Sequence, residues 1–134
     1  MWRKIRQDAR EASGGTCDIC GEPERTGMIC HEEWEYEDAA HVAVLTRFRW
    51  ICPDCNGVIH IGGGAYSYSG DLQRDPGMLV LEHMIAVNGM DLDQATAALI
   101  EANHAYDERS SHEWSVRLSD DVIQRYPFLM DVSL

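Results

Sequence analysis

The spacing of apolar and polar positions predicts a helix and a two-stranded hairpin in the first part of the chain. Apolar residues recur at helical spacing over residues 2–12 and glycines follow, which indicates a short amphipathic helix. Its apolar face would consist of Trp2, Ile5, Ala9 and Ala12. Residues 28–36 and 42–51 favour strands, because β-branched and aromatic residues alternate with other side chains there. The acidic stretch 35–38 would join the two strands.

The pattern in the second half of the chain predicts mainly helices. One is expected over residues 75–89, because Asp-Pro is typical of a helix start and Asn-Gly of a helix end. Asp91 and Gln94 form the pattern of a capping box for another helix, which would extend to about Arg109. The expected apolar faces are Leu79, Met84, Ile85 and Val87 in the first helix, and Leu92, Ala95, Leu99, Ala102 and Tyr106 in the second.

These elements together predict an α+β fold. A short extended piece is expected at residues 114–118, a last helical turn near 120–126, and a glycine-rich loop at 62–70. The loop would link an N-terminal unit, residues 1–61, to a helical C-terminal lobe, residues 62–134, that packs on it. At 134 residues the chain is expected to form one compact domain.

Composition places the chain among globular proteins. Its hydrophobic content is 45%, and no apolar run approaches the roughly 20 residues needed to span a bilayer. Residues 1–10 are charged and lack the apolar region of a signal peptide. We therefore expect a soluble, cytoplasmic protein without a membrane partner.

The cysteines are best explained by a metal ion. Four of the five form two Cys-x-x-Cys pairs, Cys17 with Cys20 and Cys52 with Cys55, whereas Cys30 stands alone. In a reducing compartment this spacing favours zinc over disulfides. Two such pairs can supply a tetrahedron of thiolates, which leaves no open position for a substrate. We therefore expect a structural zinc ion that joins the first helix, the hairpin and the segment after it.

The net charge of −12 argues against simple nucleic-acid binding, because phosphates are recognised through Lys and Arg. The charge is uneven, however, since seven of the eleven basic residues lie in residues 1–60. Arg47 and Arg49 share one face of the second strand and are the candidates to bind a substrate phosphate. The alternative is a solvated face on which both pair with the nearby glutamates.

Three residues would meet once the hairpin and the segment after it fold. His31 lies on the first strand, and Asn56 directly follows the last paired cysteine. His60 comes four residues later, on the same face of a short helix expected over residues 56–60. A hairpin followed by this helix would place His31 opposite Asn56 and His60.

This arrangement resembles the HNH (His-Me finger) endonucleases, in particular zinc-braced members such as the phage Holliday-junction-resolving enzymes. The resemblance covers about residues 15–61 and extends to small uncharacterised bacterial and phage proteins of this family. It rests on Cys17-Asp18-Ile19-Cys20, then Cys30-His31, then Cys52-Pro53-Asp54-Cys55-Asn56. The spacing from Asn56 to His60 is also similar to the two helical metal ligands of colicin-type nucleases. The resemblance implies a zinc-stabilised ββα-metal finger within residues 1–61.

The resemblance also implies a role for each candidate residue. His31 would be the general base that takes a proton from the attacking water. Asn56 and His60 would hold one divalent cation, Mg²⁺, Mn²⁺, Ni²⁺ or Zn²⁺, at the scissile phosphate. His41 is one candidate to orient the imidazole of His31. Arg47 or Arg49 would grip the phosphate.

Cys30 departs from the family pattern, in which the residue before the catalytic histidine is usually Asp or His and binds the metal. A thiolate is a poor ligand for Mg²⁺. One alternative is a transition metal with Cys30 among its ligands, and another is an ion held by Asn56, His60 and a neighbour such as Glu32. A third is an inactive nuclease site. Cys30 can also be a small buried core residue.

Other residues have structural alternatives as well. His60 would favour the helix dipole as a C-terminal cap, and Asn56 would suit a turn. The remaining histidines, His83, His104 and His112, are expected to be structural or exposed. The helix region 78–87 would be either the interface of a homodimer or the core of the second lobe.

The leading functional hypothesis is a metal-dependent HNH-type endonuclease that hydrolyses phosphodiester bonds in DNA. The second is a catalytically inactive zinc-binding protein of the same fold that acts through protein contacts. It would be an acidic inhibitor, an adaptor or a DNA mimic, as phage counter-defence proteins are. A cysteine-based redox enzyme is the third class.

Overall fold

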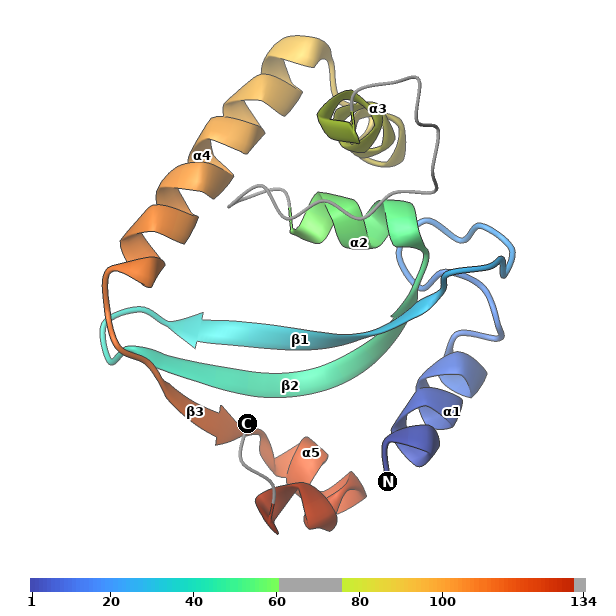
Figure 1. Cartoon of the computed structure of the whole chain (residues 1–134), viewed down its shortest axis with the longest axis vertical. Coiled ribbons are helices and arrows are strands. Elements are labelled where there is room, and N and C mark those ends of the chain that lie inside the picture. The colour runs from blue at the N-terminus through green and yellow to red at the C-terminus, as the bar shows by residue number, and fades with distance from the viewer. Residues whose placement is uncertain (61–75, 132–134) are drawn as a thin grey trace.

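The protein has a mixed α+β fold with one small sheet (Figure 1). The structure is a computed structural model that describes residues 1–60 and 76–131. Its three strands lie in the order β1-β2-β3. The expected glycine-rich loop at 62–70 and the helix start at Asp75 lie outside the described residues. No helix in the described part of the chain is long and apolar enough to cross a membrane.

Helix α1 (Trp2–Ala12) forms where the sequence predicts it and packs on the sheet through two of its four predicted apolar positions. Ile5 and Ala9 are buried, whereas Trp2 and Ala12 at the two ends are exposed. The buried stripe is therefore narrower than expected. Only the middle of this helix contributes to the core.

Strands β1 (Ile29–Glu37) and β2 (Val42–Ile51) form the predicted antiparallel hairpin. Side chains alternate between the two faces along each strand. One face carries most of the candidate residues. It bears two opposed pairs, His31 with Arg49 and Glu33 with Arg47.

A β-bulge interrupts the hairpin directly after these pairs. Glu33 pairs with Arg47, but the next residue, Trp34, pairs with Leu45, so that Thr46 is an extra residue on β2. The Thr46 hydroxyl donates a hydrogen bond to the Glu33 carbonyl at 3.0 Å. The bulge lets Leu45 enter the core, where it is 1% exposed, with Trp34 packed nearby.

Strand β3 (Ser115–Leu118) adds to β2 in parallel and completes the sheet. The sequence predicts this extended piece but not its pairing partner. The Ser119 hydroxyl then caps helix α5 (Asp120–Arg125) by accepting from the Val122 amide at 3.2 Å. A short 3-10 helix η1 (Pro127–Asp131) follows.

The main core lies between the sheet and the helices on one of its faces. Figure 1 shows α1 and α5 on this side and α2, α3 and α4 on the other. Several side chains here are almost fully buried, and they come from α1, β2 and α5. They are Ile5, Leu45, Ile51 and Val122, with Leu129 of η1 beside them.

Helix α2 (Pro53–Ile59) begins three residues earlier than the sequence predicts. Cys52 is its N-cap and accepts a hydrogen bond from the Cys55 amide at 3.4 Å, while the proline suits the first turn because it has no amide hydrogen to satisfy. The second cysteine pair is therefore part of the helix start rather than a separate turn. His60 directly follows the helix as its C-cap.

Helices α3 (Pro76–Asn88) and α4 (Leu92–Ser110) pack with α2 around a second, smaller core. It contains Val80, Met84 and Ala95, and Val58 of α2 packs against it. The structure thus shows residues of the 78–87 region in the alternative role, as a core between helices.

The predicted apolar faces of these helices are partly wrong. Met84 and Ala95 are buried, but Val87 is 36% exposed, Leu92 59% and Tyr106 52%. Helix α4 buries Ala95 near its start, and the predicted positions Leu99 and Ala102 are partly buried against the same small core. The capping box at its start is present as predicted.

Candidate metal centre

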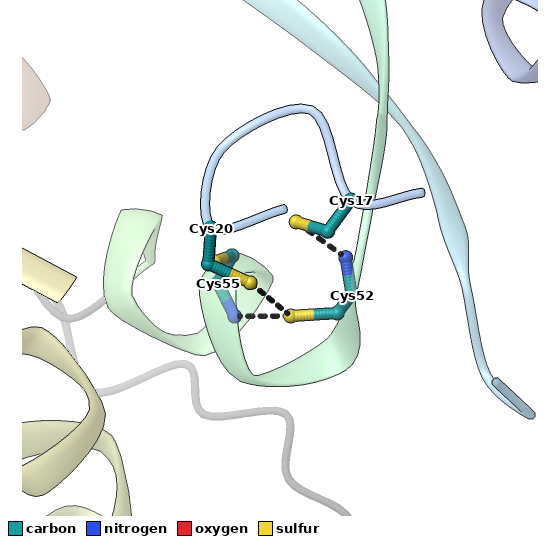
Figure 2. A group of neighbouring side chains, drawn as sticks. All are labelled: Cys17, Cys20, Cys52 and Cys55. Atoms are coloured by element: carbon teal, nitrogen blue, oxygen red, sulfur yellow. Dashed lines mark hydrogen bonds between the residues drawn. The ribbon is translucent and has the colours of Figure 1, made fainter. Parts of the chain in front are cut away.

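The two cysteine pairs come together as the sequence predicts. Their four sulfurs all lie within 4.8 Å of one another. Cys17 and Cys20 come from the turn after α1, whereas Cys52 and Cys55 come from the junction of β2 and α2 (Figure 2). Three of the four residues are buried and none forms a disulfide. Such a cluster can bind a metal ion such as zinc.

Backbone hydrogen bonds hold the two pairs in place. The Gly21 amide donates to the Cys17 carbonyl at 2.9 Å and closes the first turn, and Gly21 has a left-handed φ of 76° that glycine adopts without strain. The Asp18 amide donates to the Trp50 carbonyl at 2.8 Å, which ties this turn to the end of β2. The Cys52 amide donates to the Cys17 sulfur at 3.3 Å (Figure 2).

The spacing of the sulfurs fits a tetrahedral ion. Zinc–sulfur bonds of about 2.3 Å in a tetrahedron separate the sulfurs by about 3.8 Å. The sulfurs of Cys20 and Cys52 lie 3.8 Å apart. Soft thiolates select ions such as zinc over Mg²⁺.

The thiols differ in how readily they ionise. Burial opposes ionisation of Cys17, but amides of Cys20 and Cys52 outweigh it and lower its pKa to about 7. Burial raises the pKa of Cys20 to about 11, and burial together with Cys52 also raises the pKa of Cys55. A bound divalent cation would favour the thiolate form of all four.

Among the described residues, Arg25 and His83 lie near the sulfurs from outside the cysteine set, and sequence spacing predicts neither. Arg25 forms an ion pair with Asp54, and its positive charge interacts with the thiol of Cys52. His83 of α3 places its Nε2 atom 3.1 Å from the Cys55 sulfur. A cation and an imidazole near thiolates stabilise their negative charge.

His31 and His60 lie side by side. Their ring centroids are 5.5 Å apart, and the rings meet edge to face at 74°. Burial lowers the pKa of His31, and the neighbouring His60 lowers it further. Asn56 lies one turn before His60 on α2 and is half-buried.

Cys30 does not join this pair. It is 7% exposed and belongs to the main core, on the face opposite His31, because consecutive residues of a strand point to opposite faces. Burial raises the pKa of its thiol to about 11. The structure therefore gives Cys30 the alternative role, a buried core residue, and does not bring it to Asn56 and His60 as a metal ligand.

Two further expectations about the neighbours of His31 also change. Glu32 alternates with His31 along β1, so Glu33 rather than Glu32 shares the face of His31. His41 lies at the far end of the hairpin, where it stacks on His112 with ring centroids 4.1 Å apart. It does not orient the imidazole of His31.

Arg47 and Arg49 lie on the face of His31, but carboxylates hold both. Arg47 donates to Glu33 at 2.9 Å. Arg49 donates to Glu33 at 3.1 Å and to Asp18 at 2.8 Å. The alternative of a face on which these arginines pair with acidic neighbours is the arrangement observed.

In comparisons with known proteins, no family model, no curated protein and no solved structure matches the chain.

Proposed function

We propose that the four cysteines bind one structural zinc ion and that the braced hairpin and helix form an HNH-type, ββα-metal site that hydrolyses phosphodiester bonds in DNA. The observation that carries the proposal is the pairing of two histidines from different elements. His31 of β1 and His60 after α2 meet with ring centroids 5.5 Å apart, and the four-cysteine cluster ties the turn after α1 to the start of α2. Two imidazoles that face one another from a strand and a helix end suit general acid–base catalysis of phosphodiester hydrolysis.

His31 is the proposed general base. Its half-buried ring and its neighbour His60 lower its pKa, so the neutral, proton-accepting form is present at neutral pH. A neutral imidazole can take the proton of a water molecule that attacks phosphorus. His31 is also fixed on a strand, which limits the positions that its ring can adopt.

Asn56 and His60 are the proposed holders of the second divalent cation. They offer an amide oxygen and an imidazole nitrogen, a donor pair that suits Mn²⁺, Ni²⁺ or Zn²⁺ and is sparse for Mg²⁺. When bound, such an ion would supply positive charge at the scissile phosphate. Among the described residues, the four cysteines are the one group of three or more acidic, thiol or imidazole ligands. Water and substrate oxygens would therefore complete this second site.

Arg47 and Arg49 are the proposed phosphate contacts. Both already lie on the face of His31, but Glu33 and Asp18 neutralise them. A phosphate would have to compete with these carboxylates. This competition would make DNA binding weak and strongly dependent on salt.

The proposal is tested by plasmid cleavage. The zinc-loaded full chain is incubated with supercoiled DNA in Mg²⁺, Mn²⁺ or Ni²⁺, alongside His31→Ala and a matched control, His104→Ala. His104 is an exposed histidine of α4. We expect nicking by the wild type and the control, and a loss of about 100-fold or more in His31→Ala. Absence of nicking in every metal, or equal nicking by His31→Ala, would refute it.

A second candidate is favoured by the ion pairs of the hairpin. Because Glu33 and Asp18 neutralise both arginines and the net charge is −12, the chain also suits a zinc-binding protein that has no nuclease activity and docks on a basic protein. This candidate predicts that the protein competes with duplex DNA for a basic DNA-binding protein. It fails if the protein nicks DNA or does not compete.

A further inference from the structure

Helix α3 contacts the metal centre through the side chain of His83. His83 places its Nε2 atom 3.1 Å from the sulfur of Cys55, which is 2% exposed. Packing holds the helix at this distance, because Val80 and Met84 of α3 lie in the small core against Val58 of α2. His83 therefore approaches the cluster from a helix whose position is fixed by apolar packing.

The chemistry of the pair fixes the direction of the hydrogen bond. A metal-bound thiolate has no hydrogen to donate, so it accepts, and the Nε2 atom of His83 must carry the proton. Backbone amides already donate to the sulfurs of Cys17 and Cys52, from Cys52 and Cys55 respectively. The sulfur of Cys55 receives its donor from a different helix. A four-thiolate centre carries two negative charges in excess of a divalent ion, so each donor stabilises it.

We propose that His83 is a positioning residue of the metal centre, whose imidazole Nε2–H donates to the Cys55 thiolate, slows loss of the metal and adds to the packing that holds α3 against α2. The inference rests on the proposed zinc site and is independent of nuclease activity. Within the described residues, α3 reaches the rest of the chain mainly through α2 and α4. Loss of the metal would therefore loosen α3 as well as the cysteine turns, while the small core with α2 remains.

The first test follows zinc release from the full chain. Zinc content is measured before any variant is compared, since a wild type without one zinc per chain would refute the metal site itself. Zinc transfer to an excess of a chelating dye is then timed for the wild type, His83→Leu, His83→Gln and the control His104→Leu. We expect His83→Leu to release zinc about tenfold faster. His83→Gln, which keeps an N–H donor, should restore most of the difference.

Two results of this test overturn the inference. One is release from His83→Leu at the wild-type rate. The other is release from His83→Gln as fast as from His83→Leu, because packing rather than the hydrogen bond would then matter. The control His104→Leu, altered on the exposed side of α4, should release zinc at the wild-type rate.

A second measurement needs no variant and holds if His83→Leu does not fold. Nitrogen-15 NMR of the zinc-loaded wild type reports which ring nitrogen of each histidine carries the proton. We expect the Nε2–H of His83 to exchange slowly with water in the zinc-loaded protein. After zinc is removed, this proton and the amide protons of α3 should all exchange faster. A His83 ring whose Nε2 atom is unprotonated or bound to zinc would overturn the proposal.

Discussion

Replacing Cys55 and, separately, Cys30 by serine changes one sulfur to oxygen in two buried residues, with opposite expected outcomes. Cys55 is 2% exposed and lies in the four-sulfur cluster. Cys30 is 7% exposed and lies in the main core, on the other face of β1 from His31. Because Cys55 and Cys30 are buried to nearly the same extent, comparing the two variants shows which thiol binds the metal.

The magnitudes follow from these surroundings. Structural zinc in small domains supplies about 10–16 kcal/mol. If four thiolates share it evenly, Cys55→Ser removes about 3 kcal/mol, which is roughly a hundredfold in zinc affinity. Cys30→Ser buries a hydroxyl in an apolar core instead, which costs about 1–3 kcal/mol of stability and lowers the melting temperature by about 4 °C per kcal/mol.

The assay combines zinc content with thermal unfolding. Each protein is dialysed against a competing chelator, its zinc per chain is measured, and it is melted with and without added zinc. We expect Cys55→Ser to lose its zinc, and Cys30→Ser to keep one zinc per chain with a lower melting temperature. Zinc loss from Cys30→Ser, or full retention by Cys55→Ser, would refute the assignment of the ligands.

Three further predictions concern the sheet and its partners. Leu45→Ala, at the bulge, should cost about 2–5 kcal/mol in urea unfolding, because the residue is 1% exposed; a loss below about 1 kcal/mol would contradict its place in the core. Glu33→Gln should free Arg47, leave Arg49 paired with Asp18 alone, and tighten DNA binding at low salt in a filter assay; unchanged binding would contradict a phosphate contact at Arg47. A hydrogen bond from Tyr126 holds the pKa of Asp8 below its usual range. The contribution of Asp8 to the free energy of unfolding is therefore fully present above about pH 4 and is lost as the pH falls through the pKa of Asp8 in the folded state. The stability of Asp8→Asn should therefore fall less steeply with decreasing pH than that of the wild type.

Much of the local structure could be predicted because short-range patterns determine it. The hairpin strands and the capping box of Asp91 and Gln94 depend on spacing along a few residues. The two Cys-x-x-Cys pairs are far apart in the sequence, but the spacing within each pair predicts that they share one ion. These patterns carry their own physical cause: alternation for a strand, a reciprocal cap for a helix start, and a shared ion for paired thiols.

What could not be predicted depends on contacts between distant segments. The bulge at Thr46 changes the side of the sheet that later residues face, and no turn residue in the sequence marks it. The parallel pairing of β3 with β2 and the approach of His83 to Cys55 are likewise tertiary contacts. The exposure of Leu92 on α4 is also a tertiary property, because Leu92 lies outside the small core that α4 forms with α2 and α3.

The position of Cys30 is a different case, because strand alternation alone separates it from His31. The resemblance to HNH enzymes favoured a shared metal site for adjacent residues, whereas the two side chains of adjacent strand residues face opposite ways. Giving alternation more weight would have identified Cys30 as a core residue and Glu33 as the acidic neighbour of His31.

X-ray absorption at the zinc edge of the purified full chain tests the central claim most directly, because it reports the identity and distance of the atoms around the ion. We expect one zinc per chain with four sulfur neighbours at about 2.3 Å. A protein without bound metal, or an ion surrounded by nitrogen and oxygen in place of sulfur, would contradict the account of how the turn after α1 is joined to the start of α2.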